Sequence, residues 1–152
     1  MSNLPPEALA FFAQTGLPGT PRGFDGFGDS PELMDELLDL VLHGPKRATC
    51  ALARWYENDP DGLPKPGDLW VIHDGAKRPR AVIRTTSVEV KPVREADAQF
   101  AWDEGEGDRS FEWWLDAHEA YWRREAARHG FTYSRDLDAV FERFELAWPA
   151  GG

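Results

Sequence analysis

The sequence predicts an α+β fold in which helices surround a small β-barrel or curled sheet of about five to six strands. Helical patterns fill the N-terminal part, and short apolar strands follow, with one long helical pattern inserted before the last of them. The length of 152 residues suits one domain that buries about two-thirds of its unfolded surface. Seven tryptophans and nine phenylalanines supply the large apolar side chains that such a core needs.

The N-terminal residues predict a short helix followed by an irregular arm. The helical pattern covers residues 5–14, with prolines near its start and Gly16 at its end. Residues 16–29 contain five glycines and two prolines, which is typical of irregular structure. We therefore expect three regions: a helix and glycine-rich arm (1–29), a main domain (30–148) and a tail (149–152).

The next element is an amphipathic helix with clear signals at both ends. Ser30 is a strong N-cap, and Pro31 follows at the first helical position. Apolar residues then recur at helical spacing as far as His43, where Gly44 and Pro45 end the helix. We expect this helix to pack on the core.

The middle of the chain predicts strands and turns. Residues 48–56 indicate a strand that runs into a turn, 58–68 a turn-rich loop, 69–73 a short apolar strand, and 80–91 a long β-branched strand. Alternation along the last strand places five side chains on one face: Val82, Arg84, Thr86, Val88 and Val90. Two positions are open to Arg84 on this largely apolar face: a ligand pocket, or the surface with its charged head in water.

A long helix and a closing strand complete the predicted domain. The helix covers residues 111–129, with Ser110 or Asp108 as its cap and Gly130 at its end, and the strand covers 139–148. One stripe of the helix carries mainly aromatic residues: Phe111, Trp114, Leu115, His118 and Trp122. We expect this stripe in the core, with His118 either a hydrogen-bonded core residue or a site residue that faces the acidic stretch described below.

Charge and cysteine content exclude several classes of function. The net charge of −10 argues against a broad grip on nucleic acid, although residues 41–94 carry a balance of +4 between acidic flanks. One cysteine, Cys50, excludes a disulfide framework, and the four histidines lack metal-ligand spacing, so we expect no metal and no cofactor. We see neither a signal peptide nor a membrane-spanning run, and we expect a cytoplasmic protein that contacts no membrane.

Residues 101–110 form the most acidic stretch of the chain. They place four carboxylates within six residues: Asp103, Glu104, Glu106 and Asp108. Like charges this close repel, so burial would make one of them hold a proton near neutral pH. Gly105 and Gly107 let the backbone aim these carboxylates at a ligand. The alternative is a solvated acidic turn before the long helix.

Lys46 and Thr49 lie three residues apart, where the second helix meets the first predicted strand. An odd separation sends strand side chains to opposite faces, so they converge only if the backbone turns, as Gly44 and Pro45 allow. A lysine beside a hydroxyl activates a nucleophile when its pKa is lowered, whereas a carboxylate such as Glu104 would keep the lysine protonated or relay a proton. Together the three residues could hydrolyse an acyl group.

Four motifs in this order resemble the ASCH domain family over residues 27–146. They are G-P-K-R-A-T, L-P-K-P-G-D, E-G-E-G-D-R-S and F-E-R-F-E-L. The resemblance implies a β-barrel similar to the PUA domain of RNA-modifying proteins, with the main domain (30–148) as the ASCH domain. It also implies a cleft between the barrel and its helices, floored by the G-x-K-x-x-T turn, that takes a nucleotide or RNA ligand.

The resemblance also implies an activity and a set of site residues. One branch of the family hydrolyses 4-acetylcytidine with a lysine, a threonine and a glutamate, which match Lys46, Thr49 and Glu104. Hydrolysis of an amide on a modified nucleoside is therefore the leading function. Cleavage of single-stranded RNA and non-catalytic RNA binding are the alternatives, and duplex DNA is not an expected partner. The predicted ligand-binding residues are Arg47, Arg54, Arg84, Glu106, Asp108 and His118.

Overall fold

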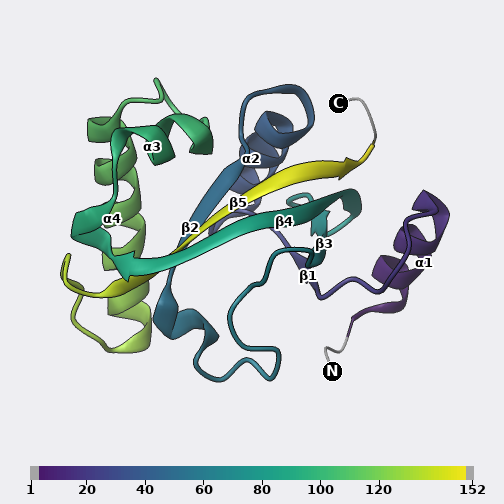
Figure 1. Cartoon of the computed structure of the whole chain (residues 1–152), viewed down its shortest axis with the longest axis horizontal. Coiled ribbons are helices and arrows are strands. Elements are labelled where there is room, and N and C mark those ends of the chain that lie inside the picture. The colour runs from purple at the N-terminus through teal and green to yellow at the C-terminus, as the bar shows by residue number, and fades with distance from the viewer. Residues whose placement is uncertain (1–3, 150–152) are drawn as a thin grey trace.

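The computed structural model describes residues 4–149, and five strands form one curled sheet within them (Figure 1). The strands are β1 (Gly23–Asp25), β2 (Ala48–Leu52), β3 (Leu69–His73), β4 (Pro79–Pro92) and β5 (Asp138–Trp148). Their order in the sheet is β1-β3-β4-β5-β2. β1 pairs with β3 in parallel, and all other pairs are antiparallel. The sheet is therefore a half-barrel whose two free edges are β1 and β2.

Helices flank the sheet, which confirms the predicted α+β class. They are α1 (Pro6–Thr15), α2 (Pro31–His43), α3 (Ala98–Glu104) and α4 (Phe111–His129), with two short 3₁₀ helices, η1 (Ala53–Tyr56) and η2 (Val93–Glu95). Figure 1 shows α3 and α4 together at one end of the sheet and α1 at the other. No helix within residues 4–149 is long and apolar enough to cross a membrane.

Alternation along β3 separates two helices onto opposite faces of the sheet. Trp70 and Ile72 belong to the cluster that packs on α2, whereas Leu69 and Val71 belong to the cluster that packs on α1. Successive strand side chains point to opposite faces, so α2 and α1 cover different sides. A hydrophobic layer therefore lies on each side of the central strands.

A third cluster joins α3 and α4 to β2 and β5. Phe100 of α3 and Trp114 and Trp122 of α4 pack against Phe141 of β5. Glu142, the next residue, points to the opposite face, where Phe144 packs on the α2 side. One side of β5 is thus core under α4, and the other side carries an acidic residue toward α2.

The helix ends follow the predicted capping signals. Ser30 Oγ accepts a hydrogen bond from Leu33 N at 3.2 Å, and Ser110 Oγ accepts one from Trp113 N at 3.1 Å. Gly130 ends α4 with a φ of 71°, a left-handed conformation that costs glycine little. Local sequence therefore fixes where these helices begin and end.

Two segments predicted as irregular contain regular structure. The arm over residues 16–29 includes β1, which lies at the sheet edge and pairs with β3. The acidic stretch begins inside a helix, because α3 covers Ala98–Glu104 and is capped by Asp97, whose Oδ1 accepts from Phe100 N at 2.9 Å. Both elements are short and depend on tertiary contacts, so their local patterns are weak. Residues 150–152 of the predicted tail lie outside the described part of the chain.

The prediction that alternate residues of β4 share one face is wrong beyond Thr85. The β4–β5 register shifts between Thr85 and Ser87, which leaves Thr86 without a partner, as in a β-bulge. The bulge turns Val88 toward the face of its partner Glu142, whereas Arg84 pairs with Glu145 on the other face. A single extra residue therefore reverses the pattern within one strand.

Trp114→Ala tests whether the aromatic stripe of α4 is core. Trp114 is 2% exposed and should cost roughly 3–5 kcal/mol of unfolding free energy when truncated. Trp55→Ala is the matched control, because Trp55 is 63% exposed and its loss should change the free energy by about 0.5 kcal/mol or less. Urea denaturation of both variants gives the comparison, and equal losses would contradict a core role for Trp114.

Candidate active site

A cavity of about 530 Å³ lies against the α2 side of the sheet, next to the β2 edge. Residues of all five strands, α2, α4, η1 and the loop after α3 contribute to its walls. Lys46, Thr49, Glu104, Glu106 and His118 all line it, so the structure brings together five residues predicted from the sequence.

The backbone places Lys46 and Thr49 on the same cavity by leaving strand geometry between them. Gly44 ends α2, and Lys46 N still donates to Leu40 O of that helix at 3.2 Å. The strand β2 begins only at Ala48, so the alternation rule does not apply across Lys46. The predicted turn at this junction is therefore present.

The Lys46 ammonium is buried and meets an acceptor for each of its three hydrogens. Nζ donates to Ala48 O at 2.8 Å, Glu104 Oε1 at 3.3 Å and Glu106 Oε2 at 2.6 Å, and the residue is 1% exposed. Burial alone would lower its pKa, but the two carboxylates outweigh burial and raise it. Lys46 is thus held as a cation, which agrees with the alternative that a carboxylate such as Glu104 keeps the lysine protonated rather than with activation through a lowered lysine pKa.

Glu104 anchors the cluster as the last residue of α3. Its Oε2 accepts from Trp114 Nε1 at 2.7 Å and lies 3.0 Å from His118 Nε2. Burial would raise the pKa of Glu104, but the positive charges of His118 and Lys46 lower it. Glu104 therefore stays ionised and holds its neighbours in place.

His118 is doubly hydrogen-bonded. Its Nδ1 lies 2.9 Å from Trp114 O, and its Nε2 faces Glu104, so each ring nitrogen meets an acceptor. Only the imidazolium donates from both nitrogens. Burial would lower the pKa of His118, but the negative charge of Glu104 raises it. This side chain belongs to the site as a second buried cation.

Glu106 is the member of the cluster whose charge changes near neutral pH. Burial, with help from the negative Glu104, raises its pKa to about 7 against the opposing charge of Lys46. The prediction that one of the four close carboxylates holds a proton near neutrality therefore applies to Glu106. Gly105 makes the approach possible: its φ is 68°, and a Cβ there would lie 2.8 Å from Lys46 N.

Four of the predicted ligand-binding residues lie outside the cavity lining. Arg47 Nη1 donates to the carbonyls of Val41 and Lys46, and the Arg54 guanidinium lies 3.7 Å from the Phe131 ring centroid. Arg84 donates to Glu145 at 2.6 Å on the outer face, and Asp108 Oδ1 accepts from Ser110 N at 2.8 Å. These side chains make contacts within the chain and do not line the cavity.

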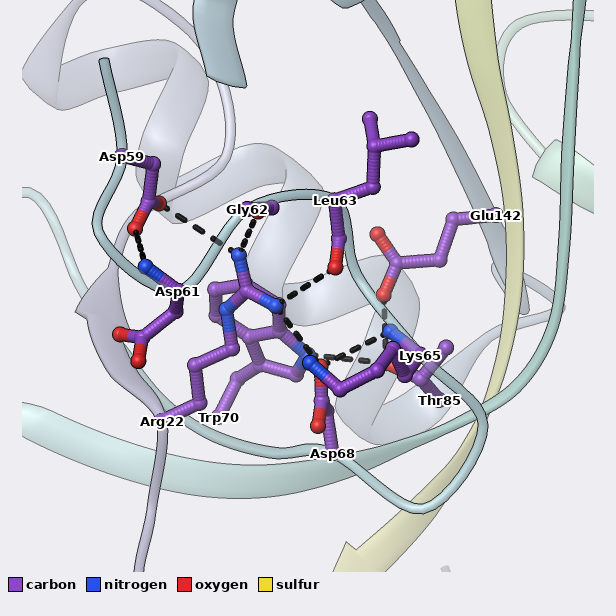
Figure 2. Close-up of polar contacts among 10 residues, drawn as sticks. All are labelled: Arg22, Asp59, Asp61, Gly62, Leu63, Lys65, Asp68, Trp70, Thr85 and Glu142. Carbon is purple, nitrogen blue, oxygen red and sulfur yellow. Dashed lines mark hydrogen bonds and ion pairs between the residues drawn. The ribbon is translucent and has the colours of Figure 1, made fainter. Parts of the chain in front are cut away.

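Sequence reasoning missed one buried carboxyl group of the cavity lining, that of Glu142. Glu142 is 4% exposed and lies directly across the β2–β5 ladder from Thr49. Figure 2 shows it beside Thr85 and Trp70, with Thr85 Oγ1 donating to Glu142 Oε2 at 2.6 Å. Burial raises the pKa of Glu142 to about 7. The available signal was a charged residue between Val140 and Phe144, two apolar residues of the same strand face.

A buried arginine holds the wall beside Glu142 together. Arg22 precedes β1, and its guanidinium donates to Asp68 at 3.0 Å and Asp59 at 3.4 Å (Figure 2). The same group lies 5.0 Å from the centroid of the Trp70 ring. Arg22 thereby fastens the loop between η1 and β3 to the N-terminal arm.

Carboxyl groups dominate the charge of the cavity. Six of them line it, against Lys46, Arg124 and the imidazolium of His118. The acidic lining residues are Asp25, Glu36, Glu104, Glu106, Glu125 and Glu142. This balance disfavours a phosphate group and suits a neutral or cationic ligand.

A family model and two solved structures are similar to this chain over most of its length. The model of the ASCH domain family matches residues 23–147. An ASCH domain from Lactobacillus crispatus JV V101 is 29% identical, with a TM-score of 0.85 over 95% of this chain and 96% of that one. The protein EF3133 from Enterococcus faecalis V583 is 32% identical, with a TM-score of 0.77 over 91% of this chain and 88% of that one.

A third solved structure supports the fold alone. The hypothetical protein PH0355 is 16% identical, with a TM-score of 0.54 over 82% of this chain and 97% of that one. The search of curated proteins gives no significant match.

Lys46→Met tests the electrostatic role of the buried ammonium. The variant removes the cation that Glu104 and Glu106 share and leaves only His118 beside Glu104, which should cost roughly 3–5 kcal/mol of unfolding free energy at pH 8. The loss should shrink toward pH 5.5, where Glu106 is already protonated. Adding Glu106→Gln should recover part of the loss at pH 8. Denaturation curves at both pH values measure these effects, and an equal loss at both, without rescue, would contradict the cluster as described.

Glu142→Gln should stabilise the protein at alkaline pH. A folded-state pKa of about 7, above the ordinary value of 4.5, means that stability is lost as pH rises between these values. Glutamine cannot ionise, so the variant should gain about 1–3 kcal/mol over the native protein at pH 8 and little at pH 4.5. Glu145→Gln, on the exposed face of the same strand, should change neither value. Denaturation of both variants at pH 8 and pH 4.5 measures these changes in the free energy of unfolding.

Proposed function

The chain belongs to the ASCH domain family, and we propose that it hydrolyses an amide on a modified nucleoside of the 4-acetylcytidine type. The observation that carries this proposal is the cluster of Lys46, Glu104, Glu106 and His118 on the wall of a cavity whose lining also includes Thr49. The cluster combines fixed cations with one carboxyl group that titrates near neutral pH, as acid–base catalysis requires.

The size and charge of the cavity support a nucleoside as substrate. Its volume of about 530 Å³ is in the usual range for a small-molecule site. The carboxyl groups of the lining outnumber its cations, and those that are ionised would repel the phosphates of a nucleotide or an RNA strand. An uncharged nucleoside avoids this repulsion and presents only polar groups to the walls.

The proposed reaction adds water across the amide bond. Ionised Glu106 accepts a proton from the attacking water or from the Thr49 hydroxyl, and oxygen bonds to the carbonyl carbon. Lys46 stabilises the negative oxygen of the tetrahedral intermediate. Glu106 then delivers its proton to the leaving nitrogen as the carbon–nitrogen bond breaks, which yields the free amine and acetate when water is the nucleophile. When Thr49 is the nucleophile, this step leaves an acyl ester on its oxygen, and a water that Glu106 deprotonates hydrolyses the ester to acetate and restores the Thr49 hydroxyl. Glu104 remains ionised throughout and keeps Lys46 and His118 in position.

Binding or cleavage of single-stranded RNA is the second candidate, because the family is generally associated with RNA. Two lining tryptophans, Trp55 and Trp113, are 63% and 38% exposed, and exposed rings of this kind can stack on bases. The basic balance of residues 41–94 gives little support, because several of its arginines are paired with carboxylates. Examples are Arg78 and Arg80 with Asp74, and Arg84 with Glu145.

Glu106→Gln should abolish most of the hydrolysis. Removal of acid–base help should lower the rate of cytidine release from 4-acetylcytidine by about 10²–10⁴. In the native protein kcat should rise with pH through about 7 as Glu106 ionises, and the rate should depend little on salt. Glu145→Gln serves as the control with native activity.

The same assays separate the alternatives. Salt-sensitive cleavage of single-stranded RNA without cytidine release would indicate a ribonuclease. Binding of either ligand without turnover would indicate a recognition module. An active Glu106→Gln variant would overturn the assignment of this residue.

A further inference from the structure

A chain of hydrogen bonds on the cavity face of the sheet fixes the orientation of one carboxyl group. Trp70 Nε1 donates to Thr85 Oγ1 at 2.9 Å, and Thr85 Oγ1 donates to Glu142 Oε2 at 2.6 Å (Figure 2). The three residues come from β3, β4 and β5 and are 9%, 1% and 4% exposed. The reaction proposed above uses none of them.

The direction of each bond in this chain follows from its donors. An indole nitrogen only donates, so Thr85 Oγ1 accepts from Trp70. The one hydrogen of the Thr85 hydroxyl then goes to Glu142 Oε2, the only other side-chain acceptor that it contacts within residues 4–149. Oε2 is therefore an acceptor, and the proton of the neutral Glu142 acid resides on Oε1.

The charged groups around Glu142 keep it neutral in the acidic half of the physiological range. Burial raises its pKa most, and the negative Asp68 and Asp25 add to this effect, while the positive Arg22 opposes it. Tyr56 of η1 also faces Glu142 and stays protonated, since burial raises its pKa. Glu142 can then act as a hydrogen-bond donor and as an acceptor at once.

We propose that Glu142 recognises the base of the nucleoside and selects an aminopyrimidine edge of the cytosine type. Oε1–H donates to the ring nitrogen, and Oε2 accepts from the neighbouring exocyclic N–H. Because Thr85 fixes which oxygen carries the proton, the order of donor and acceptor is fixed. A uracil in the same orientation presents the reverse order and places donor against donor. This inference rests on the proposed function and adds the residue that recognises the base of its substrate.

The position of Thr49 fits this orientation of the base. Thr49 and Glu142 are direct partners across β2 and β5, which places their Cβ atoms about 4.5–5.5 Å apart. An exocyclic nitrogen bound at Glu142 would therefore carry its acyl group next to the Thr49 hydroxyl. The recognised edge and the reacting amide belong to the same exocyclic nitrogen, so one residue both selects and positions the substrate.

Calorimetric titration of cytidine and uridine between pH 5.5 and 8.5 tests the proposal without turnover. The native protein should prefer cytidine by about tenfold or more at pH 6, since a good bidentate pair discriminates by that amount. Its affinity for cytidine should fall as pH rises above about 7, where Glu142 ionises. Glu145→Gln should match the native protein throughout.

Three variants isolate the role of the acid. Glu142→Gln keeps one donor and one acceptor, so in a Glu106→Gln background, which removes the other lining group with a pKa of about 7, it should retain the preference for cytidine with a flat pH profile. Glu142→Ala should lose the preference. Thr85→Val should still bind cytidine but discriminate less against uridine, because the proton is no longer confined to one oxygen. Thermal melting at each pH confirms that the variants are folded.

The outcomes separate this inference from the proposed function. An unchanged preference in Glu142→Ala, or a persisting pH dependence in Glu142→Gln that follows a group such as Asp25, overturns the role of Glu142. Cytidine release from 4-acetylcytidine by the native protein would leave the proposed function standing in that case. A native protein that binds neither nucleoside and does not act on 4-acetylcytidine overturns both.

Discussion

The buried ammonium of Lys46 holds together parts of the chain that lie 58 and 60 residues apart in sequence. Its three acceptors belong to β2, to the end of α3 and to the loop that follows α3. Burial of a charged group is unfavourable unless its hydrogen-bonding partners are well placed. The folded state therefore requires β2, the end of α3 and the following loop to be in position together. The need to satisfy one cation therefore positions α3 and the acidic loop against the sheet.

Glu104 and Glu106, which both contact the buried Lys46, differ in their protonation near neutral pH. Glu104 faces two cations and accepts from the Trp114 indole, so it stays ionised. Glu106 accepts a hydrogen bond from Lys46 and lies beside the ionised Glu104. Its pKa is therefore higher, and it keeps its proton to a higher pH. Two identical side chains separated by one glycine thus differ in charge because of what surrounds them. This difference gives the cluster one group that can exchange protons near neutral pH.

The cavity has a second acidic group, Glu142, whose orientation is determined by different contacts. Glu142 forms no salt bridge with any described residue, and its orientation comes from a neutral hydroxyl and an indole rather than from a cation. One wall of the cavity is therefore ionic and the other is polar but neutral at mildly acidic pH. Such a division suits a ligand with a reacting polar bond at one end and a hydrogen-bonding edge beside it.

The sequence by itself determined the α+β class, the capped ends of α2 and α4, and the principal strands, because these depend on signals within a few residues. Family motifs also brought Lys46, Thr49 and Glu104 to attention. Only the tertiary structure decided that α3 and β1 are regular, that Lys46 is a fixed cation, and that Arg84 faces outward. Each of these depends on distant partners or on a bulge, and a pKa depends on the burial and charges that folding creates.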